Sequence, residues 1–388
     1  MPDVVIVGGG IIGAASAFEL ARAGASVTLL EKDELAAGAS GRNLGFIDLP
    51  KDPALDPMCR ASVEMYLAVT EDGPVPVFLD REPIGTLAIA VDEVQAVAVR
   101  EEADLARASG IRAERLDAGA VRALEPELTP EVTDAWLLDG GRRVDPGGLT
   151  VCLAHLARSH GATIRHHAPA RRLLERGERV TGVVTDDEVI EADAVVLAAG
   201  PWSTGLLRPL GVALPVAGAR GWLVHLGPDR PLISHWIEGA ARTLFRMRME
   251  PVTAAAFAER DAPHDAGPML QPSPDGTVVV GTSREAALSW EPLSLDAPRE
   301  IAAAAIRLVP ALAEAPVLAT WSGVRPMSPD ERPLIGWVRD GLLVATGHGS
   351  EGVILGGGTA QQVSALVLGS EPPFDNAPFE PGRFAGQS

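Results

Sequence analysis

The first 31 residues constrain the fold of this chain more than any other stretch. Residues 4–7 form a short apolar run, Val-Val-Ile-Val, of the kind that builds a buried parallel strand. A glycine motif with G-x-G-x-x-G spacing follows directly, formed by Gly8, Gly10 and Gly13. Apolar residues then recur at helical spacing up to Gly24, and residues 26–30 form a second predicted strand that ends before Glu31. This order of elements predicts a βαβ unit.

Each part of the unit has a physical role in binding a dinucleotide. Gly8 permits the tight turn, Gly10 lets a pyrophosphate approach the backbone, and Gly13 lets the helix pack closely against the strand. The helix N-terminus faces the phosphates. Glu31 lies about 20 residues further on, where its carboxylate can accept hydrogen bonds from ribose hydroxyls. The sequence therefore predicts a dinucleotide site.

A signal peptide or a membrane span would also contain an apolar run. Residues 1–3, Met-Pro-Asp, supply no basic n-region. Glu19 and Arg22 interrupt the apolar run well short of the ~20 residues that a span needs. We therefore prefer the dinucleotide site and expect no membrane span.

Composition limits what the protein binds. The chain has 388 residues, 46% hydrophobic and 22% charged, which is typical of a soluble globular protein with two domains. Its formal net charge of −19 argues against nucleic acid or an anionic membrane as a partner. Cys59 and Cys152 suggest neither a disulfide framework nor a metal site, and we expect a cytoplasmic protein.

The first half of the chain contains further predicted elements. Helices are expected at residues 57–69 and 92–109, and strands at 84–91, 134–138 and 191–200. Asp145 is a predicted N-cap and Pro146 a first helical residue, so a helix should begin there and run to about residue 160. We expect residues 163–165 and 179–185 to form a hairpin-like unit.

The second half changes pattern at residue 214, where strands begin to alternate with turns. The clearest strands are residues 221–226, 243–249 and 277–281, with a helix at 298–308. This region, to residue 322, reads as a separate, mostly antiparallel domain. Residues 342–346 then form a buried strand that leads into a glycine loop, with a helix at 358–368 and a wrapped or loose tail at 371–388.

A glycine-rich loop and the glycine end of a strand could contact the predicted ligand. Residues 36–45 are small and glycine-rich, so backbone amides could approach a large ligand while Arg42 offsets phosphate charge. An ordinary surface loop with one basic residue explains this pattern equally well. The strand at 191–200 ends at Gly200, which would also bring its carboxyl end to the cofactor, although any parallel core strand has this appearance.

Taken together, these segments resemble the D-amino-acid oxidase superfamily of flavoproteins, which includes glycine oxidase, sarcosine oxidase and related amino-acid dehydrogenases. The resemblance spans nearly the whole chain. It is carried by GGGIIG (8–13), Glu31, ASGRNLG (39–45), RVDPGGL (143–149), VVLAAGPWS (195–203), GVRPMSPDERPLIG (323–336) and ATGHGSEGVIL (345–355).

The resemblance implies an α/β protein of two domains. A Rossmann-type FAD-binding domain would be assembled from the discontinuous segments 1–80, 143–213 and 323–388. Residues 81–142 and 214–322 would form a mainly antiparallel β substrate domain with flanking helices.

The resemblance also implies which residues bind FAD. The matching positions and their neighbours are Gly8, Gly10, Ile11, Ile12, Gly13, Glu31, Lys32, Ser40, Arg42, Asn43 and Leu44. Ala170 would offer its backbone on the adenine side, and Gly200 would follow the last core strand. Gly349, Ser350, Gly352 and Val353 match the loop near the flavin ring.

The cofactor is expected to be FAD bound noncovalently. No histidine precedes His155, and the cysteine that tethers flavin in monomeric sarcosine oxidases would fall at about Gly323. Those enzymes also use a substrate-domain lysine to activate oxygen, whereas lysine occurs here only at Lys32 and Lys51. Dehydrogenase activity is therefore a rival to oxidase activity.

Two residues are candidates for catalysis. Arg325 aligns with an arginine that holds the substrate carboxylate; the alternative is a structural salt bridge to Asp330 or Glu331. His348 could stabilise charge beside the flavin, or it could only order its loop. Without a nearby lysine, we expect modest oxygen reactivity that depends on His348 and declines as pH rises through its pKa.

Several weaker candidates remain. Arg246, Arg248, His235 and Trp222 could form the substrate-domain wall, although ordinary strand positions explain them better. Trp202 is expected to be a packing residue.

The predicted function is oxidation of the C–N bond of an amino acid or secondary amine, by hydride transfer to flavin N5, giving an imine that water hydrolyses. The electron acceptor would be oxygen or another molecule. A 2-hydroxy-acid oxidoreductase, a flavin subunit of a multi-subunit dehydrogenase and a non-enzymatic flavin-binding protein are the alternatives, and a homo-oligomer or partner subunit stays open.

Overall fold

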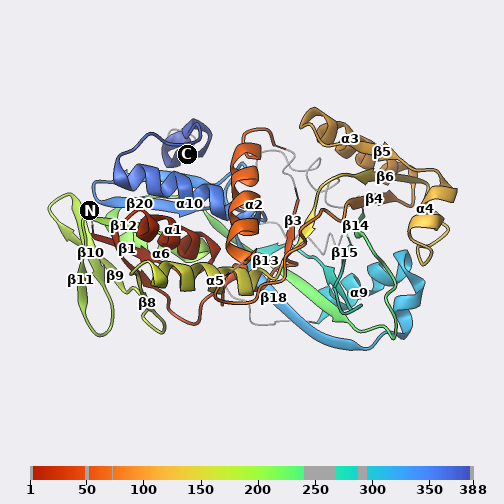
Figure 1. The fold of residues 1–388 in the computed structure, drawn as a ribbon, viewed down its shortest axis with the longest axis horizontal. Coiled ribbons are helices and arrows are strands. Elements are labelled where there is room, and N and C mark those ends of the chain that lie inside the picture. The colour runs from red at the N-terminus through yellow and green to blue at the C-terminus, as the bar shows by residue number, and fades with distance from the viewer. Residues whose placement is uncertain (1–2, 49–51, 72, 240–267, 287–294, 385–388) are drawn as a thin grey trace.

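Two large sheets organise the molecule. The computed structural model describes residues 3–48, 52–71, 73–239, 268–286 and 295–384; the predicted strand at 243–249, with Arg246 and Arg248, lies outside these residues. Figure 1 shows an elongated molecule, with one sheet and its helices in the left half and the other sheet in the right half. The long strands β13 (Ala217–Leu226) and β18 (Val317–Met327) run from the middle of the molecule into the right half.

The sheet of the left half has six strands among the described residues, in the order β19-β20-β12-β1-β2-β8. They are β1 (Asp3–Val7), β2 (Ser26–Leu30), β8 (Thr163–Arg165), β12 (Ala194–Leu197), β19 (Leu334–Arg339) and β20 (Leu342–Thr346). All pairs are parallel except β19 with β20. The predicted βαβ unit is therefore confirmed at its centre, where β1 is buried on both sides.

Helices α1 (Ile11–Arg22), α5 (Pro146–Ser159) and α10 (Gly352–Leu368) pack against this sheet, and α2 (Asp56–Glu71) packs against α10 and α5. Asp145 caps α5 through a 2.9 Å bond from the Gly148 amide, and Pro146 is its first residue, as predicted.

The prediction that α10 begins at residue 358 is wrong, because the helix starts six residues earlier at Gly352. Residues 356–358 are three glycines, which in the sequence indicate a loop. In the fold they allow α10 to approach α2 closely: a Cβ on Gly358 would lie 2.4 Å from the Met58 carbonyl oxygen. Tyr66 of α2 donates a 2.9 Å hydrogen bond to the Val353 carbonyl and joins the two helices further.

The sheet of the right half has nine strands among the described residues, in the order β17-β13-β16-β15-β14-β4-β6-β5, with β18 beside β13. The remaining bounds are β4 (Thr86–Ala90), β5 (Ala113–Arg115), β6 (Asp134–Leu138), β14 (Trp236–Gly239), β15 (Met269–Pro272), β16 (Val278–Gly281) and β17 (Glu285–Ala286). Every pair is antiparallel except β14 with β4. The mainly antiparallel substrate sheet is thus confirmed, with α3 (Glu93–Ala108), α4 (Ala118–Leu124) and α9 (Asp296–Leu308) around it.

Smaller sheets and helices complete the described chain. Strands β9 (Arg172–Arg176), β10 (Arg179–Val184) and β11 (Val189–Glu191) form an antiparallel sheet, and β3 (Phe46–Ile47) pairs with β7 (Arg142–Arg143). The predicted hairpin of residues 163–165 with 179–185 is wrong, because β8 pairs with β2 and β10 pairs with β9. Short helices are α6 (Ser203–Leu207), η1 (Ala39–Gly41), η2 (Gly200–Trp202), η3 (Arg208–Leu210), η4 (Pro310–Glu314), η5 (Ala377–Phe379) and η6 (Pro381–Phe384).

The two sheets follow the expected division of the chain closely. All strands of the six-stranded sheet fall in the segments assigned to the FAD-binding domain. One strand, β18, crosses the boundary drawn at residue 323. The C-terminal tail packs against the left half of the molecule, because Phe379 is buried in the hydrophobic core of that half. We keep the two-domain division as a proposal.

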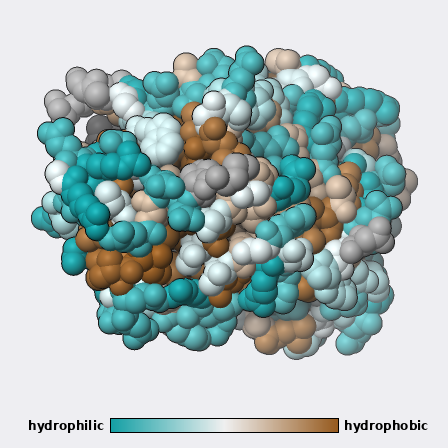
Figure 2. Space-filling model, turned by 60° about the vertical axis from the view of Figure 1, so that its left-hand side comes forward, coloured by the Kyte–Doolittle hydropathy of each residue, from teal (hydrophilic) through white to brown (hydrophobic). Residues whose placement is uncertain are grey.

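Figure 2 shows a face on which hydrophilic residues predominate and hydrophobic residues gather in separate patches. Within the described ranges, no helix combines the length and the apolar character needed to cross a bilayer.

Candidate active site

A cavity of about 560 Å³ lies where the two sheets meet. One side is formed at the carboxyl ends of the central parallel strands, where Val7, Leu30, Ala198 and Thr346 line it. The other side is a face of the nine-stranded sheet. Ligands of open parallel sheets bind at this carboxyl edge, so the fold itself points to this cavity.

The glycine motif forms a turn that larger residues could not make. Gly8 has φ +114°, and a Cβ there would lie 2.4 Å from the Ala198 carbonyl oxygen. Gly13 lies behind the turn rather than in the cavity wall, and a Cβ there would lie 1.9 Å from the Gly8 carbonyl oxygen. Gly13 therefore sets how closely α1 packs on the turn, as the sequence predicts.

Glu31 is held by the backbone around the glycine turn. Its Oε2 accepts a 2.6 Å hydrogen bond from the Gly9 amide, and its Oε1 accepts one of 2.8 Å from the Asp33 amide. An ionised carboxylate has about four acceptor sites, so two remain within its capacity for ribose hydroxyls. Ser40 fixes the other side of the turn by accepting a 2.9 Å bond from the Ile11 amide.

Two helix N-termini open into the cavity. Ile11 begins α1 and Gly352 begins α10, and both line it. Helix α1 has Gly10 as its N-cap and no acidic residue in its first turn, so the partial positive charge of its N-terminus is not offset by its own side chains, whereas α10 has the acidic Glu351 as its N-cap. A pyrophosphate is the kind of group that such an arrangement favours.

The other predicted cofactor residues also line the cavity. These are Gly10, Ile12, Lys32, Arg42, Asn43, Leu44, Ala170, Gly200, Gly349, Ser350 and Val353. Arg42 donates a 2.7 Å bond from Nε to the Ala37 carbonyl, which keeps its loop folded against the cavity. The location of these residues fits the prediction, and the role of each stays a prediction.

His348 lies in the cavity wall but cannot carry the predicted charge. It is 1% exposed, and its Nε2 shares a 3.0 Å hydrogen bond with the buried Thr359 hydroxyl. Burial lowers the pKa of His348 to about 3. We expected oxygen reactivity to decline as pH rises through a histidine pKa near 6.5. That expectation is corrected, because a His348 imidazole with this pKa is neutral from pH 5 to 9.

Arg325 extends into the substrate side of the cavity. Its Nη2 donates a 2.7 Å bond to the Thr282 hydroxyl, and its Nη1 donates one of 3.2 Å to the Ser283 carbonyl. The carboxylates suggested as structural partners pair with other arginines: Asp330 with Arg383 at 2.8 Å and Glu331 with Arg284 at 3.0 Å. The Thr282 hydroxyl and the Ser283 carbonyl thus help to orient Arg325.

The sequence reasoning missed most of the substrate side. Glu238 pairs with Met269, Met269 with Gly281, and Gly281 with Leu223, so these positions form one row across four strands. Glu238, Met269 and Leu223 all point into the cavity. The alternation of the strands could indicate two faces, but their pairing is needed to place them in one row.

Aromatic residues close this side of the cavity. Phe46 stacks on Trp236, with ring centroids 4.0 Å apart and planes 16° apart. Trp202 also lines the cavity, and the Lys32 ammonium lies 5.0 Å from its ring centroid. Trp202 is therefore part of the wall as well as a packing residue.

Two other candidates lie away from the cavity. Trp222 is buried in the core of the nine-stranded sheet. His235 shares a 2.7 Å contact through Nδ1 with Glu125, a buried carboxylate. Trp222 is a strand residue of β13, as the alternative interpretation held, and His235 directly precedes β14 (Trp236–Gly239).

The described lining of the cavity suits FAD. Its elongated lining runs from Glu31 and Ala170 to Arg325 and Trp236, which suits a long ligand with an adenine end and a flavin end. The described residues contain no group of three or more histidine, cysteine or acidic side chains that could hold a metal ion.

Comparison with known proteins agrees with this fit. Residues 3–366 match the DAO family model, described as FAD dependent oxidoreductase. A glycine oxidase of Pseudomonas putida is 30% identical over 391 residues, covering 98% of each chain. A D-amino acid dehydrogenase of Cereibacter sphaeroides is 26% identical over 433 residues, covering 96% of this chain and 93% of the relative. The crystal structure of glycine oxidase from Geobacillus kaustophilus matches with a TM-score of 0.85 at 27% identity, over 98% of both chains.

Proposed function

This chain belongs to the FAD-dependent oxidoreductase (DAO) family, and from that premise we propose that it oxidises the C–N bond of an amino acid or secondary amine. Membership makes the chain an FAD-dependent oxidoreductase. The substrate would be of the glycine, sarcosine or D-amino-acid type. The product is an imine, which water hydrolyses to a carbonyl compound and ammonia or an amine. The two electrons that are removed pass on to oxygen or another acceptor.

One observation carries the proposal: a single cavity combines the dinucleotide cradle with the guanidinium of Arg325. Bound FAD supplies the hydride acceptor for the carbon next to nitrogen. Arg325 binds the substrate carboxylate through two parallel hydrogen bonds, which fix orientation as well as affinity. The contacts of Arg325 with Thr282 and Ser283 support this role, because they fix the direction of the guanidinium on the substrate side of the cavity.

The remaining wall residues exclude water, and none of them is assigned a role in accepting a proton from the substrate. Leu44, Leu223, Trp236 and Met269 give the substrate side an apolar lining. His348 is neutral at physiological pH, so it serves as a hydrogen-bonding group. We assign no general base, because an amine that binds neutral needs none for hydride loss.

The test is anaerobic mixing of the FAD-loaded protein with amino acids, secondary amines, simple amines and 2-hydroxy acids, with flavin bleaching as the readout. Amino acids should bleach the flavin and release ammonia or an amine. Bleaching by 2-hydroxy acids alone, with a 2-oxo acid as product, would favour the hydroxy-acid alternative.

A variant links this activity to Arg325. Arg325→Ala should lower kcat/KM for carboxylate substrates. The expected loss of transition-state stabilisation is about 2–4 kcal/mol, the usual cost of losing a charge-assisted pair. FAD content should be unchanged. An equal loss for simple amines that lack a carboxylate would contradict the assigned role.

A further inference from the structure

We propose that the stacked rings of Phe46 and Trp236 form the end wall of the substrate pocket, and that they set how long an apolar substituent the substrate can carry. The inference rests on the proposed function, in which Arg325 holds the substrate carboxylate. Both rings line the cavity, and their centroids lie 4.0 Å apart.

This ring pair bridges the two surfaces between which a substrate must lie. Phe46 begins β3 and follows Asn43 and Leu44, which belong to the predicted cofactor side of the lining. Trp236 begins β14 of the nine-stranded sheet, on the other side of the cavity. Because the two rings stack across the gap between these surfaces, the space for a substrate ends at the ring pair.

Arg325 marks the opposite end of this space. Its guanidinium lies over Gly221 of β13, and strands β16 and β15 separate β13 from β14. Three strand spacings amount to about 14 Å. Leu223 of β13, Met269 of β15 and Glu238 of β14 line the cavity between the two ends. With its carboxylate at Arg325, a substrate can extend another substituent along Leu223 and Met269 toward the ring pair.

Neither ring of the end wall has room to move aside. The tip of the Phe46 ring fills the place of a side chain at position 141, since a Cβ on Gly141 would lie 2.3 Å from Cζ of the ring. Trp236 lies against the other ring and is 4% exposed. Protein interiors are close-packed, so a wall of this kind discriminates between ligands that differ by one or two methylenes.

A buried carboxylate fixes the backbone directly before Trp236. Oε1 of Glu125 accepts hydrogen bonds from the Ser234 amide at 2.9 Å and from the His235 amide at 2.8 Å. It also accepts one of 2.7 Å from the Ser234 hydroxyl. We therefore assign Glu125 as a positioning residue for Trp236.

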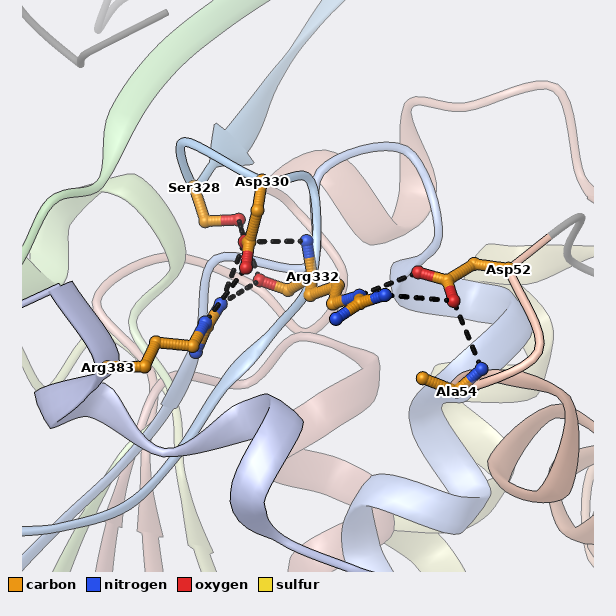
Figure 3. Close-up of polar contacts among 6 residues, drawn as sticks. All are labelled: Asp52, Ala54, Ser328, Asp330, Arg332 and Arg383. Carbon is orange, nitrogen blue, oxygen red and sulfur yellow. Dashed lines mark hydrogen bonds and ion pairs between the residues drawn. The ribbon is translucent and has the colours of Figure 1, made fainter. Parts of the chain in front are cut away.

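The Arg325 end of the pocket is tied down as well (Figure 3). In the turn after β18, Arg332 binds Asp52 through Nε at 2.7 Å and Nη2 at 3.2 Å. Arg383 of the C-terminal tail binds Asp330 through Nε at 2.9 Å and Nη2 at 2.8 Å. Bidentate pairs restrict orientation, so they hold the end of the strand that carries Arg325. The distance between the two ends of the pocket is thus fixed.

The test uses straight-chain carboxylates that cannot react, from acetate to octanoate, measured by the perturbation of the absorption of bound FAD. In the wild type, affinity should rise about three- to fourfold for each methylene up to a limiting length and fall beyond it. At the limiting length, replacing the terminal methyl by an ammonium should weaken binding about tenfold or more.

Variants of Phe46 should move this limit. Phe46→Ala should lengthen it by at least two carbon atoms, because the chain then enters the space of the ring. Phe46→Leu keeps apolar packing against Gly141 and should lengthen the limit by less. Phe384→Ala is the matched control, since Phe384 lies in η6 of the C-terminal tail, away from the described lining.

Glu125→Gln tests the support of the wall. It should weaken the discrimination beyond the limiting length, and this effect should be smaller in the Phe46→Ala background, where the wall is already open. A loss of general stability alone would act equally in both backgrounds. Anaerobic flavin reduction by straight-chain 2-amino acids should show the same limit as carboxylate binding.

The inference is overturned if Phe46→Ala leaves the limiting length unchanged, or if the affinity of the wild type does not depend on chain length. Tighter binding of the chain with the ammonium would overturn the assignment of an apolar substituent. If amino acids still bleach the flavin in these cases, the proposed function stands alone. If no carboxylate perturbs the FAD spectrum of the wild type, the role of Arg325 is overturned together with this inference.

Discussion

The guanidinium of Arg325 lies over Gly221 of the neighbouring strand, so closely that a Cβ on Gly221 would lie 2.2 Å from Nη1 and 2.6 Å from Nη2. The absence of a side chain at position 221 is what gives the guanidinium its place. The clash would involve the far end of a flexible side chain, which can move away. A substitution here therefore tests the position of Arg325 without removing its charge.

Gly221→Ala should lower kcat/KM for carboxylate substrates, because a displaced guanidinium no longer meets the carboxylate in a productive geometry. The expected loss of transition-state stabilisation is about 1–2 kcal/mol. Stability should change little. Steady-state kinetics and FAD content of Gly221→Ala, beside Arg325→Ala, measure this. Unchanged kinetics would mean that the position of Arg325 does not matter for turnover.

Gly13→Ala should abolish or strongly reduce FAD binding, since its Cβ would lie 1.9 Å from the Gly8 carbonyl oxygen, a backbone atom that cannot move without opening the turn. The matched control is Gly205→Ala: Gly205 lines the same cavity, and a Cβ there has no atom within 4 Å. Flavin absorbance per protein after purification is the measurement. Full flavin content in Gly13→Ala would contradict the packing argument.

His348 should make the fold less stable in acid. Its pKa is lowered to about 3 by burial, whereas an unfolded histidine has a pKa near 6.5. Between these values the unfolded state binds a proton that the folded state does not, so stability is present above pH 6.5 and is lost as pH falls. The loss from pH 7 to pH 5 should be about 2 kcal/mol for this residue.

The check is thermal or denaturant unfolding of wild type and His348→Gln at both pH values. The variant should show a smaller difference between pH 7 and pH 5, whatever its absolute stability. Equal pH dependence in wild type and His348→Gln would show that His348 is not buried neutral.

The flavin should be released completely by acid precipitation. Cys59 and Cys152 are free and buried, and neither lines the cavity. Burial also raises the pKa of the Cys59 thiol, which makes it a poor nucleophile. Absorbance at flavin wavelengths in supernatant and pellet is the measurement. Yellow colour in the pellet would indicate a covalent link and contradict this expectation.

The cofactor side of the molecule was predictable because its signals are local in sequence. A glycine turn, the helix after it and an acid at the end of the next strand report on contacts between neighbours in the chain. The same holds for Asp145 and Pro146 at the start of α5, where the cap forms within one turn. Strand β8 was assigned to the wrong partner, because pairing between distant strands leaves no local signal.

The sequence by itself thus determined the family, the dinucleotide turn and the presence of Arg325 in its motif. Only the tertiary structure decided what surrounds them. Register across separate strands brought Glu238, Met269 and Leu223 into one row. Burial, a property of the packed chain, made His348 neutral. Strand pairing and desolvation both depend on residues far apart in the sequence, and a local pattern carries no information about either.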